Sequence, residues 1–106
     1  MQFKHLKIAV FTPISHSKQV REALAEAGAG HIGNYDNCSF STRGTGRFRG
    51  KEGTTPHIGK PGKIEEVEEE RIETILPSEK LDAVLAAVKK AHPYEEPAID
   101  IYPLLN

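Results

Sequence analysis

The 106-residue sequence has no tryptophan and one cysteine, and aromatic residues make up only 7% of it. A single cysteine, Cys38, cannot form an internal disulfide and is typical of a reducing compartment. An excess of charge is also missing, since the formal net charge is −1. This balance disfavours general electrostatic binding to nucleic acid or to an anionic membrane.

Long apolar runs are missing as well. The N-terminal segment MQFKHLKIAVFTPIS is too short and too interrupted for a signal peptide. Nothing in the chain approaches the roughly 20 apolar residues of a membrane span. We therefore expect a cytoplasmic protein, and the length predicts one domain over residues 1–106 with an aliphatic core.

Hydrophobic periodicity predicts strands and helices in alternation. Residues 6–11 have Leu6, Ile8 and Val10 on one face and are mostly apolar on the other, which predicts a largely buried strand, and residues 99–102 alternate between apolar and polar positions as a half-buried strand does. Residues 20–27 and 81–88 carry apolar side chains at helical spacing. The order of these segments indicates a mixed α and β domain.

Capping residues set the expected ends of the two helices. Ser15 or Ser17 is the expected N-cap of the first helix, and Ser78 is that of the second. Gly28 and Gly30 should end the first helix, because glycine adopts the left-handed conformation that follows many helices.

The middle of the chain is the least regular part. Residues 38–49 alternate cleanly as a strand, and Gly44 and Gly46 within it predict a bulge or a close backbone approach. The segment Gly50–Gly62 is rich in glycine and proline, so we expect an exposed, mobile loop that is a candidate contact for a protein partner. Helix propensity and strand alternation both fit residues 63–76, although the strand needs a phase change near Val67.

A strand over residues 63–76 would supply a partner for the strand before it. Its glutamates would meet the arginines of that strand in cross-strand pairs, and those arginines are Arg43, Arg47 and Arg49. The element order then becomes βαββαβ. That order predicts an α+β, ferredoxin-like fold with an antiparallel four-stranded sheet and both helices on one face.

The stretch HPYEEPAIDIYPL, residues 92–104, follows the second helix. Pro93 should stop that helix at His92, where unpaired carbonyls favour the charged form of the ring. The stretch is either a rigid structural turn, which we favour, or part of a metal site. Its candidate metal ligands are His92, Glu95 and Glu96, with His16 as a further candidate, because histidine and carboxylate suit zinc and similar ions.

Several of these segments together resemble a known family. AGAGHIGNYDNCSF, GTGRF, PHIG, EEVEEERIE and HPYEEPAIDIYPL are similar to the insert domain of the YqfO-like dinuclear-metal-centre proteins, also called NGG-interacting factors. The resemblance implies a PII- or CutA-like unit that assembles into trimers through its sheet, and it implies that residues 63–76 are a strand. The family's metal-binding lobes lie on either side of the insert and have no counterpart here. We therefore expect a free-standing version of the insert, without the family's metal ligands.

Two functions are consistent with these features. The favoured one is a binding or regulatory module, a homotrimer that binds a divalent metal ion or a small ligand at inter-subunit clefts. Its candidate ligand-binding residues are His92, Tyr94, Glu95, Glu96, Gly44 and Gly46. The alternative is a metal-dependent hydrolase centred on His92, Glu95 and Glu96. Enzymatic activity is the less favoured hypothesis, because no base–nucleophile pair is visible in the sequence, and no catalytic residue is assigned.

Overall fold

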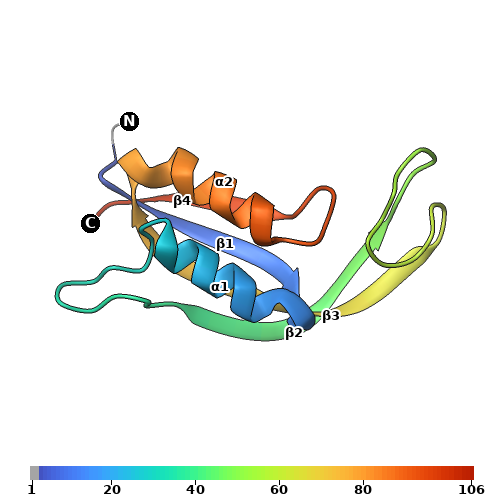
Figure 1. The fold of residues 1–106 in the computed structure, drawn as a ribbon, viewed down its shortest axis with the longest axis horizontal. Helices are drawn as coiled ribbons and strands as arrows, with labels where there is room; N and C mark the ends of the chain where they lie inside the picture. The colour runs from blue at the N-terminus through green and yellow to red at the C-terminus, as the bar shows by residue number, and fades with distance from the viewer. Residues whose placement is uncertain (1–2) are drawn as a thin grey trace.

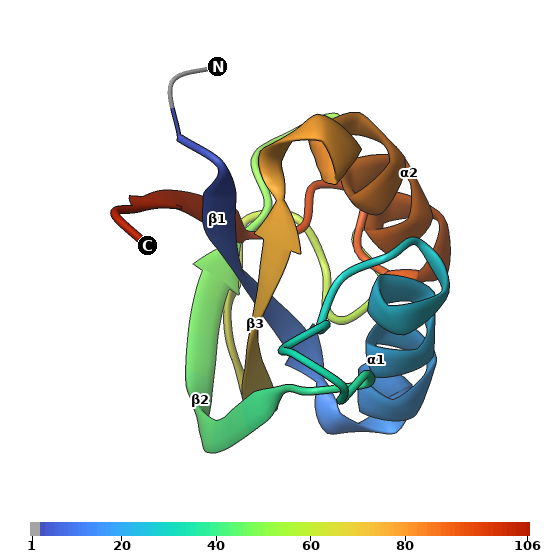
Figure 2. The same cartoon turned by 90° about the vertical axis from the view of Figure 1, so that its left-hand side faces the viewer.

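Residues 3–106, the part of the chain that the computed structural model describes, form a four-stranded antiparallel sheet with two α-helices on one face (Figures 1 and 2). The strands lie in the order β2-β3-β1-β4. This is the predicted ferredoxin-like fold, and residues 63–76 belong to a strand. The elements are β1 (His5–Pro13), α1 (Ser17–Glu26), β2 (Phe40–Arg49), β3 (Ile64–Pro77), α2 (Leu81–Ala91) and β4 (Ile99–Leu104).

Strand β3 is the longest element and pairs on both of its edges. Its pairing with β1 runs from Pro77 to Glu69, whereas its pairing with β2 runs from Glu73 to Ile64. The register of both ladders is continuous, but the less exposed positions change from odd-numbered to even-numbered residues at Glu69 and Glu70, so the predicted phase change is present just beyond Val67. Because the pairing with β1 stops five residues earlier, the β2–β3 hairpin extends beyond the body of the domain (Figure 1).

The core lies between the helices and the two central strands. Every second residue of β1 and β3 faces the helices, and burying each of these side chains contributes about 1.5–3 kcal/mol relative to exposure. The core is aliphatic, as the composition predicts. Its fully buried members are Leu6, Ile8, Val10, Val20, Leu24, Ala29, Ile72, Leu76, Val84 and Val88.

The two α-helices begin differently from the prediction. Each follows a 3-10 turn, Ile14–His16 before α1 and Ser78–Lys80 before α2. The N-cap residues are His16 and Lys80, and neither caps its helix with a side-chain hydrogen bond within the described residues. The predicted caps Ser15, Ser17 and Ser78 are therefore wrong, because the turn displaces them from the cap position. No helix of residues 3–106 is long and apolar enough to span a membrane.

The helix C-termini follow the sequence closely. Gly28 has a φ of 105°, and its N–H donates to the carbonyl of Ala25, while the Ala29 N–H donates to the carbonyl of Leu24. These two bonds form a Schellman motif, as the glycine predicts. Helix α2 ends at Ala91 with His92 at the C-cap, the position that Pro93 requires.

Ion pairs across β2 and β3 confirm the expected meeting of arginine and glutamate at Arg43 and Arg47, whereas Arg49 lies opposite Ile64. Arg47 lies opposite Glu66, with Nε 2.6 Å from Oε2, and Arg43 lies opposite Glu70 at 3.9 Å. Glu70 also binds Arg21 of α1 at 2.8 Å, which ties that helix to the sheet. The exposed Arg47–Glu66 pair contributes at most about 1 kcal/mol, so this pair fixes the register more than it stabilises the fold.

Candidate functional site

A cleft of about 890 Å³ opens where the β2–β3 hairpin leaves the body. Its base is the sheet face opposite the helices, where Phe11, Glu69 and Arg71 of the central strands lie. One wall is β2 and the loop after it, and the other is the turn after α2. These walls comprise residues 42–51, 54, 56 and 57 on one side, and residues 94, 95, 96 and 98 on the other. A cleft of this volume has the size of a small-molecule site.

Tyr94 connects the two walls of the cleft. Its ring lies 5.6 Å from that of Phe48 on β2 and 6.3 Å from that of His57 in the loop, between ring centroids. Its hydroxyl donates a 2.8 Å hydrogen bond to Oε2 of Glu69. Burial, this hydrogen bond and the charge of Glu69 all raise the pKa of the Tyr94 hydroxyl. Tyr94 is therefore a neutral donor held in one position.

The Glu69 carboxylate lies directly against the backbone of β2. A Cβ atom added to Gly46 would overlap this carboxylate, whereas nothing described lies within 4 Å of a Cβ added to Gly44. The close backbone approach predicted from the two glycines is thus present at Gly46. Gly46 leaves room for the Glu69 carboxylate, which then accepts the Tyr94 hydroxyl.

His92 is buried, with 6% of its surface exposed, and both of its ring nitrogens are in hydrogen bonds. Nε2–H donates to the backbone carbonyl of Phe11 at 2.6 Å, and the Tyr94 N–H donates to Nδ1 at 3.1 Å. This pair of bonds fits the neutral ring, because a proton on Nδ1 would face the Tyr94 N–H.

The pKa of His92 is lowered, chiefly by burial and further by the nearby His16 and His57. The hydrogen bond to Phe11 and the charge of Glu69 oppose this shift without overcoming it. The expectation that the helix end would favour the charged ring is wrong. The ring donates to a carbonyl of β1 instead of the helix carbonyls, and burial dominates.

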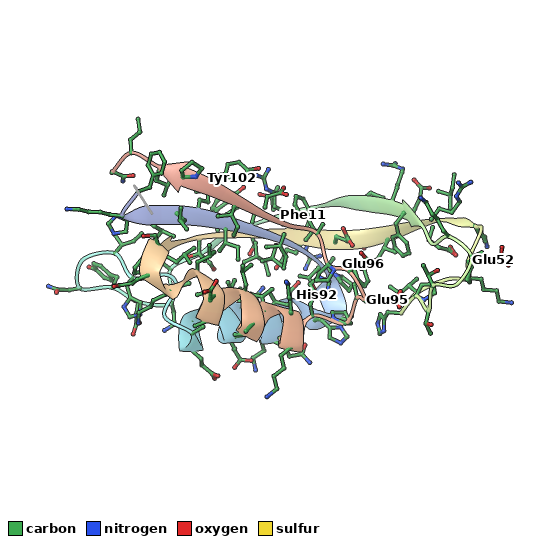
Figure 3. The ribbon with its side chains drawn as sticks, turned by 90° about the horizontal axis from the view of Figure 1, so that it is seen from above. Phe11, Glu52, His92, Glu95, Glu96 and Tyr102 are labelled. Atoms are coloured by element: carbon green, nitrogen blue, oxygen red, sulfur yellow. The ribbon has the colours of Figure 1, made fainter. Side chains whose placement is uncertain are left out.

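The two glutamates after His92 lie apart from its ring nitrogens. Glu95 accepts a 3.3 Å hydrogen bond from the backbone N–H of Thr55, which joins this turn to the hairpin loop. Glu96 lines the cleft beside Glu95. Figure 3 shows both in the turn beyond His92, near the end of β1 where Phe11 lies.

The predicted metal ligands are not assembled into a site within one chain. His16 lies in the 3-10 turn before α1, where its ring packs against that of His57. Among residues 3–106, no group of three or more His, Cys, Asp or Glu side chains is placed to hold a metal ion. The carboxylate whose charge raises the pKa of His92 is that of Glu69, a residue that the sequence did not single out.

We expect Gly46→Ala to destabilise the domain by about 1–3 kcal/mol, because the new methyl group displaces a buried carboxylate from its hydrogen bond with Tyr94. Gly44→Ala is the matched control, and its free energy of unfolding should stay within about 0.5 kcal/mol of the wild type. Urea unfolding measures both. Equal losses of unfolding free energy in the two variants would show that the cost comes from replacing a glycine in the strand and not from displacing Glu69.

The lowered pKa of His92 predicts acid-dependent stability. The unfolded ring titrates near pH 6.5 and the folded ring lower, so the unfolded state binds more protons between these values. The contribution of neutral His92 is therefore complete above about pH 6.5 and is lost as the pH falls towards the folded pKa.

Urea unfolding between pH 7.5 and 5 should show this loss in the wild type and a flatter profile in His92→Gln. The control His31→Ala removes an exposed histidine and should keep the wild-type slope. A His92→Gln profile as steep as that of the wild type would contradict the assignment.

Comparison with known proteins identifies relatives over nearly the whole chain. The chain is 58% identical over 100 residues to a GTP cyclohydrolase 1 type 2 homolog of Halalkalibacterium halodurans, which covers 94% of this chain and 27% of that protein. The chain thus spans about a quarter of the length of the curated relatives it matches. No protein-family model matches the sequence.

Solved structures agree with this relationship. A Bacillus cereus protein related to NIF3 superposes with a TM-score of 0.85 at 50% identity, over 98% of this chain and 26% of that chain. The periplasmic divalent cation tolerance protein CutA of Archaeoglobus fulgidus shares the fold, with a TM-score of 0.69 at 23% identity, over 96% and 85% of the two chains. In sequence and in fold, the chain therefore corresponds to the CutA-like segment of the NIF3/YqfO-like family.

Proposed function

We propose that this segment is a cytoplasmic binding or regulatory module that holds a small ligand in the cleft beneath the β2–β3 hairpin. The cleft is the observation that supports this proposal, because its volume suits a small molecule and its walls combine aromatic and charged groups. Phe48 and Tyr94 offer ring faces, and Arg49 and Lys51 offer positive charge. The ligand would be an organic anion with an apolar part.

The sequence-predicted residues have distinct roles in this proposal. Gly44 presents open backbone to the ligand, Gly46 acts through the Glu69 carboxylate for which it leaves room, and Tyr94 supports the aromatic wall. Glu95 and Glu96 line the opposite rim, where Glu95 holds the loop. His92 lies behind Tyr94 and positions it through its own hydrogen bonds, so it would act on the ligand indirectly.

We further propose that the module forms a trimer through the sheet face opposite the helices, with loop Gly50–Gly62 exposed to other partners. That face carries Tyr102, which is 41% exposed, next to the Lys7–Glu73 ion pair at 3.7 Å. Arg71 lies over the ring of Phe11 at 5.7 Å. The outer edges of β2 and β4 lack sheet partners within residues 3–106, and such edges pair readily with other chains.

The hydrolase alternative receives no support from the site geometry. Both ring nitrogens of His92 are in hydrogen bonds, so this ring presents no free base to the cleft, and the set of His92, Glu95 and Glu96 is left without its histidine. A binding role needs none of these groups to change its protonation state. The ligand-binding function is therefore the better account of these residues.

The dye 1-anilinonaphthalene-8-sulfonate tests the cleft, because it combines an aromatic system with an anionic group. We expect it to bind the wild type and to bind Phe48→Ala at least about fivefold more weakly, since an aromatic contact buried by the ligand is worth more than about 1 kcal/mol. Fluorescence titration measures both affinities.

Phe40→Ala is the matched control for the dye. Phe40 lies on the same strand and the same sheet face as Phe48, but it is 70% exposed and is not part of the cleft lining. Its loss should leave the dye affinity unchanged. If both variants weakened binding equally, the dye would be reporting general apolar surface and the proposed cleft site would be rejected.

Light scattering tests the assembly. The wild type should have three times the 11.7 kDa mass of the chain, and Tyr102→Glu should shift it towards the monomer, because it places a charge on the helix-free face. Lys89→Glu, on the exposed side of α2, should leave the mass unchanged. A monomer mass for the wild type across micromolar concentrations would refute the trimer.

A further inference from the structure

Two histidines from distant parts of the chain meet at the side of the cleft. His16 belongs to the 3-10 turn after β1, and His57 belongs to the hairpin loop. Their ring centroids are 5.5 Å apart, and the ring planes are nearly perpendicular at 87°. His57 is exposed and His16 is partly so, which leaves both rings accessible to solvent.

This spacing is compatible with metal coordination. Two imidazoles bound to one tetrahedral zinc ion through bonds of about 2.0–2.1 Å place their ring centroids about 5–6 Å apart. The orientation of His16 is already fixed, because the Ser15 hydroxyl oxygen lies 2.9 Å from its Nδ1. In the tautomer in which Nδ1–H donates to this oxygen, Nε2 keeps its lone pair. Ligating histidines are commonly held through the second nitrogen in this way.

We propose that His16 and His57 form a two-histidine site for a divalent transition metal, completed by water. The donor set favours zinc, copper or nickel over magnesium or calcium, because imidazole is a borderline ligand. This site shares His16 with the metal set predicted from the sequence but none of the other members of that set. His92 is excluded from it by its two hydrogen bonds, and Glu95 is not a member.

The metal would cross-link the hairpin loop to the body of the domain. At present the loop is held there by the Thr55–Glu95 hydrogen bond and by ring contacts of His57. Since His57 lines the cleft, a metal on His57 fixes one side of the ligand site. The proposal goes beyond ligand binding and does not require it.

Zinc alone is the probe. Calorimetric titration and thermal unfolding of the full chain should show zinc binding and a raised melting temperature for the wild type. Loss of an outer-shell partner already lowers metal affinity by about 10–100-fold. We therefore expect His16→Ala and His57→Ala each to weaken zinc binding at least about tenfold and to lose the shift. Zinc should also slow limited proteolysis within residues 50–62 of the wild type only.

A control separates this site from non-specific binding to surface histidine. His31→Ala removes an exposed histidine and should bind zinc as the wild type does. Wild-type affinity in His16→Ala or His57→Ala would overturn the proposal, and so would an equal loss of affinity in His31→Ala. Absence of any zinc-dependent shift in the wild type would show that the rings pack without a metal.

Discussion

The unequal pairing of β3 with its two neighbours determines the shape of this domain. From Glu69 to Glu73 the strand lies between β1 and β2, and its C-terminal half has the aliphatic core against one face. From Ile64 to Glu68 only β2 lies beside it, and this part of the hairpin extends away from the helices. The inward-facing backbone groups of the hairpin pair with one another, and its exposed outer edges can be satisfied by water, so the extension needs no core of its own. The cleft lies where this extension begins.

A small polar network occupies the base of that cleft. Glu69 accepts the Tyr94 hydroxyl, the Tyr94 N–H donates to His92, and His92 donates to the carbonyl of Phe11. Each donor in this network meets an acceptor on its neighbour. With neutral His92 and neutral Tyr94, all of these polar groups are therefore paired. Buried polar groups are stable only when they are paired in this way. The network joins β1, β3 and the turn after α2, and so it orders the wall that carries Tyr94.

The balance of forces at His92 shows why local rules are not enough. The end of α2 attracts a positive charge, an effect worth typically 0.3–1 kcal/mol at an exposed helix end. Removing a charged ring from water costs more than this. The ring is 6% exposed and has an acceptor to offer to Tyr94, so the neutral form is favoured. The helix end therefore determines where His92 lies, while its protonation follows from its surroundings.

The sequence by itself determined the elements of this protein, their order and most of their ends. Alternation placed β1, β2 and β4, helical spacing placed α1 and α2, and Gly28 and Pro93 ended the helices. Residues 63–76 remained ambiguous, because a run of glutamates has helix propensity and only its pairing with β1 and β2 makes it a strand. The serine caps failed because the 3-10 turns at the starts of the helices leave little trace in the sequence.

The site depended on contacts that join distant segments, and these only the tertiary structure decided. Glu69 is one glutamate among several in its strand, and its role comes from the register that places Gly46 beside it. The meeting of His57 with His16 depends on how the hairpin loop folds back. A sequence pattern records local periodicity, whereas burial and hydrogen-bond partners are set by residues tens of positions away. The residue types of the site were therefore visible in the sequence, and their chemical states were not.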